Sequence, residues 1–288
     1  MFDFKYKHSP DIYIWNPLVR KFKIVPEPPL STFERNDWSA LAFGFLPELN
    51  DYVVVHIVKP GSTSAPFSRD EDDHTYEQYP HSVVIGVYSL NTNSWKKICQ
   101  DKFFVEFVIT GRSLFVNGTA YWVGFYSRML SQSIVYFDTK TNILGQVKVP
   151  DWIALHTRLD DIPVILPFGQ SIAYFVEVGQ GDADEGGDEY GSRHLEMWVF
   201  KDYMVDEFSW EKKLSVCLSE NIPAQVLGIR NSGEPLLAKS NNLISYDLDT
   251  HEPYDFIEST PYTYHKEHLI SPYTISPFVE TLLLLDID

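Results

Sequence analysis

Two short segments carry residue types found in catalytic and cofactor-binding loops. "GRSLF", which starts at Gly111, has the serine of a G-x-S-x-G nucleophile elbow but lacks the second glycine. "GQGDAD", which starts at Gly179, opens like a dinucleotide-binding loop, yet Asp184 stands where the third glycine belongs and no helical pattern follows. A P-loop lysine motif is also missing from the sequence. We therefore expect no catalytic residue and no cofactor.

Acidic residues and histidines occur in places where a metal site could be sought. An EF-hand frame that starts at Asp182 puts Gly186 at the fifth position and Arg193 where a bidentate glutamate is required. His74 and His81 flank "TYEQYP", a loop-like stretch that fixes no ligand geometry. The two cysteines are far apart and have no partner at metal-ligand spacing. The sequence therefore predicts reduced thiols and no metal.

Acidic residues are concentrated in two clusters of an acidic chain, which has 23 basic and 40 acidic residues and a net charge of −17. This charge repels a phosphate backbone, so we expect no nucleic-acid partner. We interpret the clusters as solvated loops and as candidate loops for binding a basic partner protein. Their members are Asp70, Glu71, Asp72, Asp73, Asp182, Asp184, Glu185, Asp188 and Glu189.

Short alternating runs of β-branched and aromatic residues dominate the chain and predict an all-β fold. One pattern, an alternating strand, a tight turn and a second strand, recurs five times. The copies are "DIYIWNPLVRKFKIVP", "VIGVYSLNTNSWKKI", "SIVYFDTKTNILGQVKVP", "LEMWVFKDYMVDEFSWEKKL" and "LISYDLDTHEPYDFIE". The first strand of each copy ends in an aromatic residue: Trp15, Tyr88, Phe137, Trp198 and Tyr246.

A small polar residue follows the aromatic residue in four copies, and an apolar residue stands seven positions beyond the aromatic in three. The polar residues are Asn16, Ser89, Asp138 and Asp247, and the apolar residues are Phe22, Trp95 and Leu144. Short polar side chains accept hydrogen bonds from backbone amides in tight turns. We therefore expect each polar residue to cap the turn and each apolar residue to start the return strand.

The aromatic markers recur at intervals of roughly 50 residues, the size of a four-stranded propeller blade. Two intervals are longer because they contain acidic insertions at 60–80 and 179–193. The additional strands include hairpins turning at Asn117-Gly118 and at Asn231 to Gly233. The sequence predicts one domain over 1–288, a β-propeller of five to six four-stranded blades.

The first copy lacks a preceding strand pair, so the first blade is incomplete unless another segment supplies strands. The C-terminal "YTISPFVETLLLLD", Tyr273 to Asp286, has strand character and no turn partner. We expect this tail to pair with the first copy and close the ring, so deleting Thr274 to Asp288 should destabilise the fold.

The tryptophans occupy strand or turn positions of the repeats, which favours packing between blades over a ligand cage. Those we expect to be structural are Trp15, Trp95, Trp122, Trp198 and Trp210. Apolar runs such as Tyr52 to Val58 are much shorter than the roughly 18 residues of a membrane span, and the N-terminus has no signal-peptide core. We expect an intracellular protein, cytoplasmic or nuclear, with no membrane partner.

Eight segments in order give the chain a family resemblance. They are "IWNPLVRKFKIVP", "LAFGFLPELNDYVVV", "VYSLNTNSW", "VNGTAYWV", "YFDTKTNIL", "MWVFKDY", "ISYDL" and "FVETLLLLD". Together they resemble the F-box-associated, kelch-like domain of plant F-box proteins. In that family the propeller recruits a target protein for ubiquitination, while an N-terminal F-box docks on the Skp-type adaptor of an SCF ubiquitin ligase.

The resemblance implies a protein-interaction module rather than an enzyme. Only ten residues precede the first copy, and they contain no F-box, so the adaptor is expected as a partner only if an F-box exists upstream. Two alternatives stay open. One is an enzymatic, hydrolase-like six-bladed propeller, which would need acidic residues or histidines on its inner strands. Among the inner-strand candidates, "SIAYFVEV" (Ser171 to Val178) carries only one such residue, Glu177. The other is a truncated F-box paralogue that binds the target without a ligase.

Overall fold

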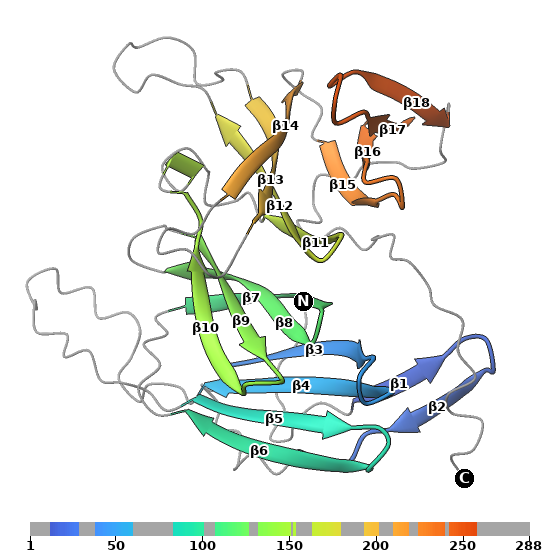
Figure 1. The fold of residues 1–288 in the computed structure, drawn as a ribbon, viewed down its shortest axis with the longest axis vertical. Coiled ribbons are helices and arrows are strands. Elements are labelled where there is room, and N and C mark those ends of the chain that lie inside the picture. The colour runs from blue at the N-terminus through green and yellow to red at the C-terminus, as the bar shows by residue number, and fades with distance from the viewer. Residues whose placement is uncertain are drawn as a thin grey trace, which may run out of the picture. The chain divides into compact units, whose positions relative to one another are not determined.

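The structure is a computed structural model that describes residues 12–28, 38–59, 83–100, 107–126, 132–150, 152–153, 163–179, 193–201, 210–218, 224–239 and 242–257. Within these ranges the chain forms eighteen β-strands and one short helical turn at 152–153. The all-β prediction is therefore confirmed. The strands form four antiparallel sheets of four strands and one sheet of two strands (Figure 1).

Each sheet is built from strands that are consecutive in sequence. The two-stranded sheet contains β1 (Tyr13–Asn16) and β2 (Lys21–Ile24). The next two sheets contain β3 (Trp38–Leu46), β4 (Asp51–Lys59), β5 (Val83–Ser89) and β6 (Ser94–Gln100), and then β7 (Phe107–Val116), β8 (Thr119–Tyr126), β9 (Gln132–Asp138) and β10 (Ile143–Lys148). The last two contain β11 (Val164–Phe168), β12 (Ser171–Gly179), β13 (Arg193–Phe200) and β14 (Trp210–Leu218), and then β15 (Ala224–Ile229), β16 (Pro235–Lys239), β17 (Asn242–Tyr246) and β18 (Pro253–Ile257).

The five sequence copies form the β1–β2 pair and the last two strands of every four-stranded sheet. The predicted hairpins around Asn117-Gly118 and Asn231 to Gly233 join the first two strands of their sheets, β7 to β8 and β15 to β16. Asn117 and Gly118 both have positive φ, 51° and 83°, as a type I′ turn requires. The repeat unit read from the sequence is therefore confirmed.

Polar side chains cap the turns of the repeats as predicted. The amide of Leu18 donates to Asn16 Oδ1 (3.0 Å), that of Thr92 to Ser89 Oγ (3.1 Å), and that of Lys140 to Asp138 Oδ1 (2.8 Å). Asp247 Oδ1 accepts from two backbone amides, which lowers the pKa of its carboxyl group. These local bonds explain why the small polar residue recurs after the aromatic residue.

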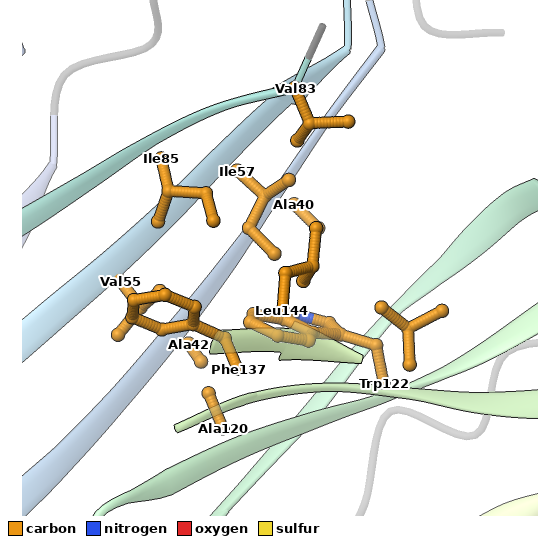
Figure 2. Packing of buried hydrophobic residues seen from close by; sticks show 11 residues of the cluster. Ala40, Ala42, Val55, Ile57, Val83, Ile85, Ala120, Trp122, Phe137 and Leu144 are labelled. Atoms are coloured by element: carbon orange, nitrogen blue, oxygen red, sulfur yellow. The ribbon is translucent and has the colours of Figure 1, made fainter. Parts of the chain in front are cut away.

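The largest core cluster lies between sheets β3–β6 and β7–β10 (Figure 2). One face of the first sheet contributes Ala42, Val55 and Ile85, and the second contributes Trp122 and Phe137. The Trp122 side chain is fully buried, and its indole N–H donates to the Leu41 carbonyl (3.2 Å). Trp122 is thus a core residue, as the sequence predicts.

The opposite face of sheet β3–β6 packs against the β1–β2 pair. Ile14 and Val25 of that pair meet Val54, Tyr88 and Leu90 in a second buried cluster. Successive residues of a strand point to opposite faces, so Val54 and Val55 serve different clusters. Sheet β3–β6 is therefore covered on both faces, as a blade between two neighbours is.

The remaining two sheets share a core of their own, with Phe175, Met197 and Leu214 from one sheet and Leu237 and Tyr246 from the other. By contacts the protein divides into two compact units, and the boundary falls within strands β9 and β10. Sheets β11–β14 and β15–β18 belong to the second unit. The single-domain assignment stays a prediction.

The fourth sequence copy aligns differently from the prediction. In the second copy Tyr88 is the cross-strand partner of Trp95, and in the fourth copy Phe200 is the partner of Trp210. The rings of both pairs are in contact, at centroid distances of 5.4 and 5.3 Å. Phe200, not Trp198, is thus the structural equivalent of the aromatic marker, two residues further along β13 than the sequence alignment placed it.

The inner-strand assignment also needs a correction. Ser171–Gly179 is β12, the second strand of its sheet, and the strand at the sheet edge is β11. The edge strands β11 and β15 contact each other, as do β3 and β7, so the first strand of each sheet is the inner one. Glu177, on β12, forms an ion pair with Arg193 of the neighbouring strand. The predicted closing tail, Tyr273 to Asp286, lies outside the described residues.

Candidate functional site

A groove of about 350 Å³ runs beside strand β1 in the first unit. Four consecutive residues, Ile12 to Trp15, line one side of it. The other side consists of Leu41, Ala42 and Phe43 from β3, with Val54 and Ser113. Because consecutive strand residues point to opposite faces, a groove that touches all four lies along the edge of β1 rather than on one face. The lining is almost entirely apolar, so the groove suits an apolar ligand or segment rather than a charged substrate.

An aromatic surface adjoins this groove on the β1–β2 pair. Tyr13 and Trp15 on β1 are the cross-strand partners of Ile24 and Phe22 on β2, and all four side chains share one face. Each is more than half exposed, Trp15 at 64%. The prediction that Trp15 packs between blades is therefore wrong for the described residues, since Ile14 and Asn16 hold the buried positions of β1.

Three further aromatic side chains continue the apolar surface on sheet β3–β6. Phe43 and Phe45 of β3 flank Tyr52 of β4, with ring centroids 5.5 and 4.9 Å from that of Tyr52. Phe43 is 48% exposed and Phe45 is 38% exposed. Exposed aromatic groups that cluster in this way are typical of surfaces that bind another chain. We call Phe43, Phe45 and Tyr52 the aromatic shelf.

His56 of β4 and Trp95 of β6 lie on the same sheet, β3–β6. The Trp95 indole N–H donates to the Pro26 carbonyl (2.7 Å), and its ring lies 6.4 Å from the His56 ring. Trp95 is only partly buried; it packs against the cluster between the β1–β2 pair and the sheet and also bonds to the pair. His56 is 1% exposed, and this burial lowers its pKa from 6.5 to about 4.

A cation–aromatic cluster occupies the second unit. The Lys212 ammonium lies 5.2 Å from the Trp152 ring centroid and 5.3 Å from that of Trp198. It also pairs with the buried Glu196 carboxylate at 3.0 Å, which accepts a bond from the Trp198 indole as well (2.9 Å). The register shift at Met197/Trp198 makes Lys212 the cross-strand partner of Trp198. Trp198 thus has a structural role, although not at the marker position.

Trp210 is partly buried and donates its indole N–H to the Lys148 carbonyl (3.0 Å). The same bond type is made by Trp95 to Pro26. Each tryptophan lies at the start of the fourth strand of its sheet. Trp95 bonds to the backbone just after β2, and Trp210 bonds to the last residue of β10. These bonds connect neighbouring sheets, so both tryptophans serve the scaffold.

The acidic residues predicted to bind a partner all lie outside the described residues: Asp70, Glu71, Asp72, Asp73, Asp182, Asp184, Glu185, Asp188 and Glu189. In chain order, the insertion at 60–80 lies between β4 and β5, and that at 179–193 lies between β12 and β13. Both therefore lie between the second and third strands of a sheet.

Searching the described part of the chain for metal sites finds no group of three or more His, Cys, Asp or Glu side chains that could hold an ion. Cys99 and Cys217 are both exposed, and neither forms a disulfide. The described residues also contain no helix long and apolar enough to span a membrane.

Within each unit, two sheets of four consecutive antiparallel strands meet at their first strands and share a core, as neighbouring blades of a β-propeller do. Residues 4–266 match the family model of the F-box associated beta propeller domain. The chain belongs to this family, as the resemblance implied.

Two relatives come from Arabidopsis thaliana. The putative F-box protein At3g10430 is 32% identical over 117 residues, 40% of this chain and 27% of that protein. The F-box protein At4g22390 is 24% identical over 264 residues, 83% of this chain and 58% of its own length. The chain thus spans between about a quarter and three fifths of the curated relatives it matches.

Two solved structures show weak structural similarity. Dipeptidyl peptidase 4 of Porphyromonas gingivalis has a TM-score of 0.44 and 12% identity, and the match covers 85% of this chain and 36% of that one. The β-propeller domain of the trilobed protease of Pyrococcus furiosus has a TM-score of 0.30 and 11% identity, with 79% and 85% covered. Neither similarity bears on the function of this chain.

Proposed function

We propose that this chain is the target-recognition module of an F-box-type receptor in an SCF ubiquitin ligase, and that it acts by binding rather than by catalysis. The observation that carries the proposal is the family match over 4–266, together with relatives that are named F-box proteins. An F-box joined upstream in the full-length protein would contact the Skp-type adaptor. The propeller would then hold the protein to be ubiquitinated, in the cytoplasm or the nucleus.

The composition of the inner strands supports binding over catalysis. β3, β7, β11 and β15 contain no Asp, Glu or His, so the described inner strands offer no general acid or base. In the described range Glu177 and Glu196 are held by Arg193 and Lys212, which are structural pairings. The hydrolase-like alternative has no supporting group in these strands.

The target is expected to present a basic surface, because the insertions at 60–80 and 179–193 each carry a cluster of acidic residues. Exposed charges attract through water, so binding should weaken as salt rises above the physiological range. The loops carry specificity in this proposal, and the strands keep them in place.

The test joins the F-box of an Arabidopsis relative to this chain and assembles the fusion with its adaptor, cullin and ubiquitin-transfer enzymes. Proteins captured by the fusion from plant extract are then offered as substrates. We expect a captured protein to be ubiquitinated by the wild-type fusion and much less by one in which 60–80 is replaced by a short Gly-Ser turn. A matched control replaces 101–106, a connection without the acidic cluster.

Ubiquitination of no captured protein would contradict the ligase role. Binding that is insensitive to salt and unchanged when both acidic insertions are replaced would contradict the assignment of the loops while leaving the ligase role intact. Turnover of a small-molecule or peptide substrate by the chain alone would favour the enzymatic alternative.

A further inference from the structure

The cation–aromatic cluster of the second unit has the form of an aromatic cage for an ammonium group. The indole rings of Trp152 and Trp198 are inclined at 43° with their centroids 6.3 Å apart, so they form two walls. The Lys212 ammonium faces both rings, 5.2 and 5.3 Å from their centroids, within the distance at which an aromatic face attracts a cation. The Glu196 carboxylate lies 3.0 Å from the same ammonium. We call Trp152, Trp198 and Glu196 the ammonium cage.

Both rings of the cage are held in place by contacts that do not involve the lysine. The Trp198 indole N–H donates to the Glu196 carboxylate (2.9 Å), which fixes the plane of that ring. Trp152 belongs to a turn anchored by Ile153, a fully buried residue whose amide donates to the backbone carbonyl three residues earlier (2.9 Å). The cage is therefore preorganised, and a cation gains its contacts without first ordering the rings.

The cage requires a cation, but that cation need not come from Lys212. The Glu196 side chain is only 4% exposed, and a buried carboxylate without a cation is strongly unfavourable. The Lys212 side chain is 43% exposed, and its flexible stem lets the ammonium turn out into water. The nearby lysines Lys201 and Lys213 both pair with Glu211, at 2.9 and 3.0 Å. An ammonium group from another chain can therefore replace that of Lys212 if the cage binds it more strongly.

The chemistry of the cage favours a dimethylated ammonium over the unmodified one that it holds. Two methyl groups can pack on the two indole faces, which attract the positive charge spread over them. The single N–H of a dimethylammonium can donate to the Glu196 carboxylate, as the Lys212 ammonium does at 3.0 Å. A trimethylammonium has no N–H for this bond, and an unmodified ammonium loses more hydration on entering.

The present occupant shows which kind of molecule can carry this group. A lysine stem already reaches the cage, so the site accepts an ammonium on a four-carbon chain. We propose that the ammonium cage binds a dimethylated lysine side chain of a partner protein, and that Lys212 is a built-in competitor that leaves when this side chain enters. This proposal goes beyond the proposed function and does not depend on it.

Titration of the full chain with three capped peptides tests the ligand. Each is Gly-Gly-Lys-Gly-Gly, with its lysine unmodified, dimethylated or trimethylated, and binding is followed by NMR of the Trp198 indole N–H, which bonds to Glu196. We expect the dimethylated peptide to bind at least tenfold more tightly than the other two. Trp152→Leu removes one wall at a position that is 39% exposed, and it should weaken this binding at least tenfold. The matched control is Tyr254→Leu in the same unit, because this ring is 36% exposed and also faces a cation, Arg230; its affinity should equal that of the wild type.

Lys212→Met gives a second measurement, which a purely structural cluster would not pass. The variant removes the competitor and leaves Glu196 without its cation, so it should melt at a lower temperature than the wild type. The dimethylated peptide should bind it at least fivefold more tightly than the wild type and raise its melting temperature, because the ligand restores the missing cation.

Three results would each overturn the proposal: equal affinities for the three peptides, an unchanged affinity in Trp152→Leu, or no recovery of Lys212→Met by the dimethylated peptide. If Lys212→Met does not fold, the titrations of the wild type and of Trp152→Leu still decide it.

Discussion

Acidification from pH 7 to pH 4.5 should destabilise the fold through His56. This side chain is 1% exposed on β4, between Leu41 and Gly86 of the adjacent strands, and lies near the Trp95 ring. Burial lowers its pKa from 6.5 to about 4, because the imidazolium would lose its hydration there. The folded protein therefore keeps His56 neutral through a pH range in which the unfolded chain is protonated.

The sign and size follow from proton linkage. Between about pH 6.5 and pH 4 the unfolded state binds more protons than the folded state, so the free energy of unfolding falls as the pH falls. A difference of 2.5 pH units between 6.5 and 4 corresponds to about 3 kcal/mol, at about 1.4 kcal/mol per unit. About 2 kcal/mol of this is lost between pH 7 and pH 4.5. The loss is a large fraction of the stability of a typical domain.

Urea unfolding of the wild type and of His56→Gln at several pH values measures this contribution. Glutamine is similar in size and does not titrate, so the variant loses stability at pH 7 but should show a shallower pH dependence. The stability difference between the two proteins should shrink by about 2 kcal/mol on going from pH 7 to pH 4.5. A constant difference across that range, or an NMR titration of the His56 ring with a midpoint near 6.5, would refute the reasoning.

Four further substitutions separate core, inter-sheet, turn and ion-pair contributions. Trp122→Ala should cost about 3–5 kcal/mol in urea unfolding, because the side chain is fully buried. Trp95→Ala should cost only about 1–2 kcal/mol, since it loses one hydrogen bond and part of a packing contact; equal costs would contradict the different burial. Asp51→Ala should cost about 1–3 kcal/mol, because the buried carboxylate accepts hydrogen bonds from the Ser89 hydroxyl and the Asn91 amide. The control is Asp249→Ala, at an exposed position. Equal losses of stability in the two variants would refute the role of the buried acceptor. Lys212→Met should destabilise the second unit, because the buried Glu196 carboxylate loses its cation. The double variant Lys212→Met/Glu196→Gln should recover part of the lost stability. No recovery in the double variant would contradict the pairing.

The repeat unit could be predicted from sequence because its signals are local. A strand, a polar cap and a return strand lie within about fifteen residues, and the cap of each turn bonds to amides two or three residues away. Alternation fixes which residues share a face once the strand is known. These features require no knowledge of how the sheets pack, so they are confirmed.

The marker residue of the fourth copy and the exposure of Trp15 depend on pairing and packing with other strands, and both were predicted wrongly. Cross-strand pairing with Trp210 identifies Phe200, not Trp198, as the residue at the marker position. Trp15 follows the same local pattern as Tyr88, yet Tyr88 is fully buried and Trp15 is 64% exposed. Burial is decided by the neighbouring strands, which sequence alternation alone does not supply.

The groove beside β1 could not be read from either of its sides alone. "IYIW" and "LAF" both resemble ordinary buried strand segments, and they lie about 30 residues apart in sequence. Only the packing of the β1–β2 pair on sheet β3–β6 shows that the edge of β1 and residues 41–43 of β3 border the same apolar groove.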